Sequence, residues 1–252
     1  MVVIDGIDKA KCYGHYYQSY QRYCTIALEV RQRHGMFKAD LAVLRAMNNT
    51  FNPLNTQVNL RSGLPARDLK KVTGSDDLVQ VRVLSPASIF AGRVLQVETP
   101  LIALPREVVA RHALKEGNVV VSARGEFVAG LVDGNPTKLT GGVPLLAGPL
   151  CHTLTCERKG GEGLSPQFLA WLLGTEYARQ HMAAASRGSA ISLYNLETVG
   201  SLQVPLLPIA EQVAIAEASS AARILREARL ALAETEAETN NAELCRHVGI
   251  RA

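Results

Sequence analysis

Long hydrophobic runs are absent from this chain of 252 residues. The longest apolar stretches, such as residues 141–150, reach about ten residues, whereas a membrane-spanning helix needs roughly 20. Asp5 and Asp8 stand where a secretory signal peptide would carry its apolar segment, which argues against secretion. We therefore expect a cytoplasmic protein that does not associate with membranes.

Cysteine is scarce as well. The chain has five cysteines, an odd number that fits a reducing compartment better than a disulfide framework. Cys151, His152 and Cys156 lie close together, but their spacing is not that of a CxxC zinc knuckle, and no second pair follows. On a strand, Cys151 and Cys156 would point to opposite faces. These residues are therefore interpreted as core residues, and no metal site is expected.

Sequence motifs of several enzyme classes are also missing. The chain has neither the G-x-x-x-x-G-K-[ST] phosphate loop nor the G-x-G-x-x-G dinucleotide fingerprint. It lacks the Asn/Asp-Pro-Pro-Tyr/Phe box of amino-methyltransferases, the G-x-S-x-G elbow and the H-E-x-x-H zinc pair. We expect no catalytic residue and no cofactor.

One enzymatic alternative stays open. Asp133, followed by Glu157 and Lys159 near the end of a strand, could hold Mg²⁺ and a water molecule for phosphodiester hydrolysis. The pattern is short, and carboxylates and lysines at strand ends are usually only solvent-exposed. A magnesium-dependent endonuclease is therefore the less favoured prediction.

The composition is that of a globular protein, with 47% hydrophobic and 20% charged residues. The formal net charge is +4, and the excess of basic residues lies in residues 1–150, whereas residues 209–252 are mildly acidic. This distribution suits a front part that binds a polyanion and a tail that binds a protein.

The pattern of residues predicts an α+β protein in three parts. Residues 1–60 are predicted to form a helical N-terminal extension, in which the helical spacing of Tyr16, Tyr20 and Tyr23 favours core packing over base stacking. Residues 61–208 are predicted to form a domain of mixed short strands and helices. The expected strands are residues 79–83, 94–97, 119–122, 127–132, 152–157 and 202–206, and the expected helices are residues 106–115 and 167–182.

Residues 209–252 contain one long helix, expected over residues 209–247, about 58 Å in length. Two apolar stripes repeat along it near 3.5 residues, so the helix has two apolar sides. A helix of this length needs a partner helix, in this chain or in another, and we expect a coiled coil. The residues predicted to contact the partner are Val213, Ala216, Ile224, Leu225, Ala228 and Leu232.

Three stretches, in the same order, resemble the specificity subunit of type I restriction–modification systems. They are Leu114–Gly125 (LKEGNVVVSARG), Leu164–Leu173 (LSPQFLAWLL) and Arg187–Gln212 (RGSAISLYNLETVGSLQVPLLPIAEQ). In the last stretch, a strand leads through Pro-Leu-Leu-Pro and an Ala-Glu-Gln sequence into the long helix. The resemblance covers about residues 65–235.

This resemblance implies a noncatalytic subunit that reads double-stranded DNA through a target-recognition domain. In that family two such domains, joined by antiparallel helices, hold two methyltransferase subunits. The present chain has one such unit and is similar to a half-sized member. It would therefore form a homodimer or pair with another specificity subunit. The N-terminal extension is either a permuted helix that packs with the tail or an added interaction domain.

Basic and polar side chains on loops of residues 61–208 are the predicted DNA contacts, because such groups neutralise phosphates and read base edges. We predict that Arg93, Arg124, Lys138, Lys159, Arg187 and Ser189 contact DNA.

Besides the endonuclease, a second alternative to DNA recognition stays open. It is a protein-only coiled-coil scaffold whose long helix carries its whole function.

Overall fold

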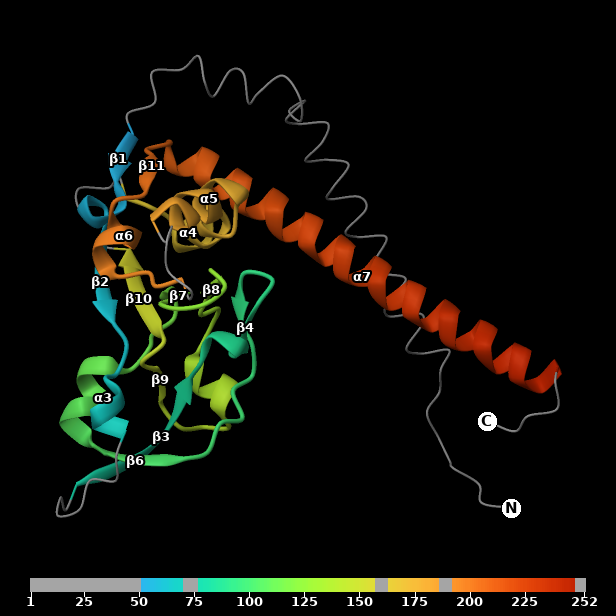
Figure 1. Ribbon diagram of the computed structural model, residues 1–252, viewed down its shortest axis with the longest axis horizontal. Helices are drawn as coiled ribbons and strands as arrows, with labels where there is room; N and C mark the ends of the chain where they lie inside the picture. Colours follow the sequence, from blue (N-terminus) through green and yellow to red (C-terminus); the bar gives the residue numbers. More distant parts are fainter. Residues whose placement is uncertain (1–50, 70–76, 157–162, 186–191, 248–252) are drawn as a thin grey trace. The chain divides into compact units, whose positions relative to one another are not determined.

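The computed structural model describes residues 51–69, 77–156, 163–185 and 192–247 (Figure 1). The predicted helices and tyrosine cluster of the N-terminal extension lie outside these residues. Contacts along the chain separate a compact unit, Asn49–Ala216, from a second unit whose described part is Glu217–His247. The first unit is called the globular unit below.

The globular unit contains a six-stranded main sheet in the order β2-β10-β7-β8-β5-β4. All neighbouring strands are antiparallel except β5 and β8, which are parallel. The strands are β2 (Val58–Ser62), β4 (Ile89–Phe90), β5 (Arg93–Val94), β7 (Val119–Ser122), β8 (Ala129–Leu131) and β10 (Cys151–Cys156).

Two smaller sheets complete the strand content of the described residues. A three-stranded sheet has the order β6-β3-β9, where β3 is antiparallel to β6 and parallel to β9. A two-stranded ribbon pairs β1 with β11, which brings the start of the described chain beside the segment that precedes the long helix. Their bounds are β1 (Phe51–Pro53), β3 (Leu78–Leu84), β6 (Ile102–Pro105), β9 (Leu145–Ala147) and β11 (Gln203–Pro205).

Both faces of the central strands are buried. Paired residues on neighbouring strands point to the same face of a sheet, and so do residues two apart on one strand. Val120 and Cys151 therefore share one face, and Val119 and Leu154 share the other. The first face joins a core cluster that includes Leu84 of β3. The second face lies next to α4, which contacts β7 and β8. Burial on both faces explains the unbroken apolar run of β7.

Short helices cover and connect the sheets. The α-helices are α3 (Arg106–His112), α4 (Pro166–Leu173), α5 (Glu176–Ala185) and α6 (Leu196–Gly200), and the 3-10 turns are η1 (Leu54–Thr56), η2 (Ala66–Leu69), η3 (Pro86–Ser88) and η4 (Pro136–Thr140). Ser165 begins α4 as its N-cap, because its side chain accepts a hydrogen bond from the Phe168 amide. Pro166 follows at the first helical position, where a missing N–H costs nothing.

The predicted strands are present, several with shifted ends, and three other expectations were wrong. Residues 51–60, which were grouped with the helical extension, form β1, η1 and part of β2, because they pair with β11 and β10. The helix predicted over residues 106–115 ends at His112, since Ala113 bridges to Leu146 of β9. The helix predicted over residues 167–182 is two helices, α4 and α5, separated at Gly174.

The long helix has the predicted bounds. It is α7 (Ile209–His247), 39 residues in length. The chain is thus an α+β protein with a long C-terminal helix, which confirms the predicted fold class for the described residues. No helix in the described ranges combines the length and apolar character needed to cross a bilayer.

Candidate functional site

Arg93 lies on the solvent face of the β4–β5 hairpin. Its guanidinium is 3.4 Å from the Asp133 carboxylate, and both side chains are about half exposed. An exposed ion pair of this kind is weak, so Arg93 can exchange Asp133 for a phosphate at little cost. The same contact gives Asp133 a cationic partner, while Glu157, the other carboxylate of the nuclease alternative, lies outside the described residues.

The same hairpin exposes an aromatic residue that the sequence analysis did not select. Phe90 is 65% exposed and pairs directly with Arg93, whereas Ile89 and Val94 on the other face are buried. Ala91 and Gly92 at the tip both have positive φ, 48° and 79°, as a tight two-residue hairpin requires. A rigid tip therefore presents an aromatic ring beside an arginine.

Arg124 lies in an exposed turn after β7, and a segment from the end of the globular unit holds this turn. The Tyr194 hydroxyl donates to the Gly125 carbonyl at 2.9 Å, and Leu193 forms a β-bridge with Arg124. The Tyr194 ring also contacts Phe127 edge-on, with 5.3 Å between centroids. These contacts set the backbone of the turn that carries Arg124.

The predicted DNA contacts do not form one cluster. Arg93 pairs with Leu131 of β8, which in turn pairs with Val119 at the beginning of β7. Arg124, in contrast, follows the end of β7. Five residues of extended chain span about 17 Å, so the two arginines lie at opposite ends of the main sheet. Exposed Lys138, in η4 after β8, lies at the Arg93 end. Lys159, Arg187 and Ser189 lie outside the described residues.

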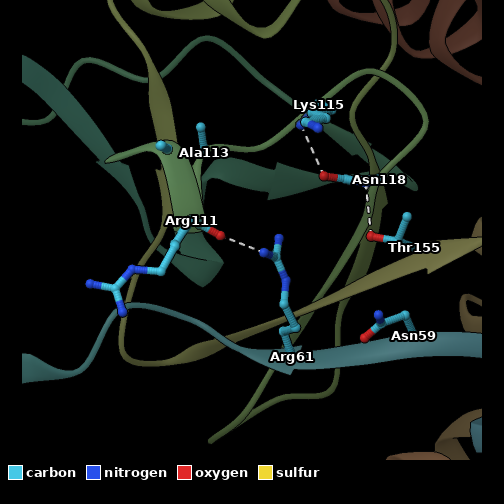
Figure 2. A pocket seen from close by; sticks show the side chains of 8 residues that line it. Asn59, Arg61, Arg111, Ala113, Lys115, Asn118 and Thr155 are labelled. Atoms are coloured by element: carbon cyan, nitrogen blue, oxygen red, sulfur yellow. Dashed lines mark hydrogen bonds between the residues drawn. The ribbon is translucent and has the colours of Figure 1, made fainter. Parts of the chain in front are cut away.

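A basic hollow opens at the Arg93 end of the sheet, on the side of β2 and β10. It encloses about 220 Å³ and is lined by Asn59, Arg61, Ala110, Arg111, Ala113, Lys115, Asn118 and Thr155 (Figure 2). The three charged residues in this set are all cationic. Arg61 is level with Gly130 of β8 and Arg93 with the next residue, Leu131, so the two arginine side chains point to opposite faces of the sheet.

Hydrogen bonds link several residues that line the hollow. Asn118, 4% exposed, accepts a hydrogen bond from the Lys115 amide and donates one to the Thr155 hydroxyl. Arg61 donates to the Arg111 carbonyl at the end of α3, where helix carbonyls lack partners within the helix. Sequence reasoning missed the hollow, because its residues come from chain segments far apart.

Cys151 and His152 of β10 are buried core residues, as predicted, whereas Cys156 at the end of the strand is only partly buried. Burial raises the pKa of Cys151 and of Cys156 to about 12, which disfavours the thiolate that a metal needs. His152 is 7% exposed, and its Nε2 lies 2.6 Å from the Tyr194 carbonyl. Burial lowers the pKa of His152, although that hydrogen bond opposes the shift. Within the described ranges, no group of three or more His, Cys, Asp or Glu residues could hold a metal.

The beginning of α7 is anchored in the globular unit by Gln212, which is 2% exposed. Its side chain accepts a hydrogen bond from the Ser165 amide at 2.7 Å and donates to the carbonyls of Leu207 and Gly163 at 2.8 and 3.2 Å. The buried amide therefore ties the segment before α4 to the beginning of α7. This explains the glutamine of the Ala-Glu-Gln sequence in physical terms.

The predicted partner residues of α7 differ in exposure along the helix. Val213 and Leu232 are 43% and 57% exposed, and Leu230 and Leu244, which were not predicted, are 55% and 64% exposed. The other predicted residues, Ala216, Ile224, Leu225 and Ala228, are partly buried. The exposed leucines leave apolar surface on the distal half of α7.

Comparison with known proteins shows similarity in fold only. No family model and no curated protein matches the chain. Its structure is similar to the HsdS subunit from Thermoanaerobacter tengcongensis, with a TM-score of 0.52 and 14% identity over 93% of this chain and 54% of that one. A chain from a type I restriction–modification system gives a TM-score of 0.50 and 14% identity over 94% of this chain and 55% of that one.

The chain spans about half the length of both structures. The fold predicted from the three sequence stretches is thereby confirmed. The chain has the fold of a type I restriction–modification specificity subunit over about half of that subunit's length.

Proposed function

We propose that this chain is the sequence-specific DNA-recognition subunit of a type I-like restriction–modification system or a related defence system. It binds double-stranded DNA through the globular unit and directs a separate methyltransferase, and the associated nuclease, to the bound site. It contributes no catalytic residue. The observation that carries the proposal is the HsdS-like fold with one globular unit followed by one long helix.

Charge and shape support DNA as the ligand of the globular unit. Arg93 and Lys138 lie at one end of the main sheet. Cations placed along one end neutralise phosphates and set the register of the protein on the duplex. The β4–β5 hairpin at the same end has the width of a two-stranded ribbon, which the major groove accepts.

We infer that the chain assembles with a second reader. One globular unit recognises one half of a two-part site, so a second copy or another specificity subunit supplies the other half. The helices hold the two recognition units at a fixed separation, because helix length is set by residue number. Exposed leucines on the distal half of α7 provide the surface for this pairing and for the methyltransferase.

Filter binding tests this function against its alternatives. The proposal predicts tight binding to one duplex sequence, a steep loss of affinity with salt, and no cleavage when Mg²⁺ is added. Cleavage that is lost in Glu157→Gln would instead support the endonuclease. The absence of DNA binding at low salt, both alone and with partner subunits, would support the protein-only scaffold.

A further inference from the structure

The basic hollow described above has no role in the predicted set of DNA contacts. Arg61, Lys115 and Arg111 line it, and the side chains that complete it are neutral. Figure 2 shows the Arg61 side chain pointing into the hollow, whereas the Arg111 guanidinium turns away toward its rim. Cations that gather without a carboxylate among the lining residues favour an anionic ligand.

The charges of Arg61 and Arg111 also act on a neighbouring histidine. The pKa of His112, next to Arg111, is lowered first by burial and then by the charges of Arg61 and Arg111, while Asp68 opposes the shift. Asp68 itself is 3.5 Å from Arg67, so its charge is partly compensated. The five ion pairs formed within the described ranges do not include Arg61, Arg111 or Lys115.

The size of the hollow restricts the ligand. Pockets for drug-sized molecules and cofactors enclose about 300–1,000 Å³, so a hollow of about 220 Å³ is too small for them. A single phosphate group is smaller than such molecules and fits in the hollow. Arg61 brings guanidinium N–H groups, which match phosphate oxygens, and Lys115 brings a flexible ammonium.

We propose that this hollow binds one backbone phosphate of DNA, held by Arg61 and Lys115 with Arg111 at the rim. The inference rests on the proposed function and deepens it, because it assigns a phosphate contact on the β2 side of the sheet, away from Arg93. The contact positions the duplex and reads no sequence. It therefore acts on every duplex, whatever the target site.

The test uses the full chain and a random-sequence duplex of about 30 base pairs, since phosphate contacts act on any sequence. The variant Lys115→Gln with Arg111→Gln changes two exposed side chains, and Arg61→Gln is added in a second variant. Arg226→Gln, exposed on α7 and outside the globular unit, is the control for a change of charge. Thermal unfolding checks that each variant is folded.

We expect both hollow variants to bind the duplex about tenfold or more weakly than the wild type, with a slope of log affinity against log salt that is smaller by about 1. Arg226→Gln should match the wild type. If the wild type binds DNA and the folded hollow variants bind it with the same affinity and salt slope, this inference is wrong and the proposed function stands.

Inorganic phosphate distinguishes the two sources of a phosphate group. If the hollow variants lose affinity for millimolar phosphate but keep that for DNA, the hollow takes a free anion and the inference is overturned. If the wild type fails to bind duplex at low salt, alone or with partner subunits, the proposed function fails and the inference fails with it.

Discussion

The side-chain carbonyl of Gln212 accepts a hydrogen bond from the backbone amide of Ser165 at 2.7 Å. Ser165 is the N-cap of α4, and Gln212 lies in the first turn of α7, so one buried contact joins the beginnings of two helices that are far apart in the sequence. This contact fixes the first turn of α7 in the globular unit.

Replacing Gln212 with Leu should lower the free energy of unfolding by about 2–3 kcal/mol, because it leaves the Ser165 amide and two backbone carbonyls without their partner. Thermal unfolding should show a midpoint lower by roughly 5–10 °C. Gln180→Leu, the same change at an exposed residue of α5, should have little effect. Equal midpoints for the two variants would refute the anchoring role of Gln212.

Adding charge to the partner stripe of α7 should prevent assembly. Ile224→Glu combined with Leu225→Glu places two carboxylates on a partly buried apolar surface, where an unpaired charge is costly. Sedimentation of the chain, alone and with a methyltransferase subunit, should show loss of the complex. Asn240→Glu with Asn241→Glu, at exposed polar residues, adds the same charge and should leave the complex intact. Assembly that survives the first pair would contradict the role of the helix.

The β4–β5 hairpin should be needed for DNA binding. Gly130, on the neighbouring strand β8, packs closely against this hairpin. A Cβ added at Gly130 would lie only 2.7 Å from the Ile89 side chain and 2.9 Å from the Arg93 backbone. Gly130→Ala should therefore displace the hairpin that carries Phe90 and Arg93. We expect a loss of DNA affinity larger than that of Arg93→Gln alone, measured on the same duplex.

Phe90→Ser offers a change on this hairpin that does not disturb its packing, because the ring is 65% exposed. Stability should be unchanged within about 0.5 kcal/mol, whereas affinity for DNA should fall. An unchanged affinity would exclude the tip from the interface.

His152 should make stability depend on pH. Burial holds its pKa in the folded state below its usual value, whereas the unfolded chain takes up a proton near pH 6.5. The unfolded state thus binds more protons below that pH, and the free energy of unfolding should decrease from about pH 7 downward. Unfolding of wild type and His152→Gln between about pH 7.5 and 5.5 should show the smaller slope in the variant. Parallel slopes would show that His152 does not carry this dependence.

Local patterns were enough to predict the elements whose residues determine their own conformation. The alternation of Val79, Val81 and Val83 predicted β3, and the absence of proline and glycine predicted the whole of α7. Residues 51–60 were misassigned because their extended form depends on pairing with β11 and β10, which no local pattern reveals. Gly174 separates α4 from α5, although its neighbours continue the apolar period.

The candidate site was predicted less well for a related reason. Single basic residues on loops can be selected from sequence, but their grouping depends on strand order and register. Arg93 and Arg124 belong to opposite ends of one sheet, and Arg61 and Lys115 meet across a hollow built from separate segments. Phe90 was overlooked because its exposure follows from the hairpin, whose other face is buried.

The most direct test is to co-express the chain with the methyltransferase subunit encoded nearby and to map methylated bases across the host genome. The proposed function predicts methylation at one two-part sequence with a fixed spacing, which disappears when this chain is omitted. Methylation that is unchanged without the chain, or that follows no common sequence, would contradict it.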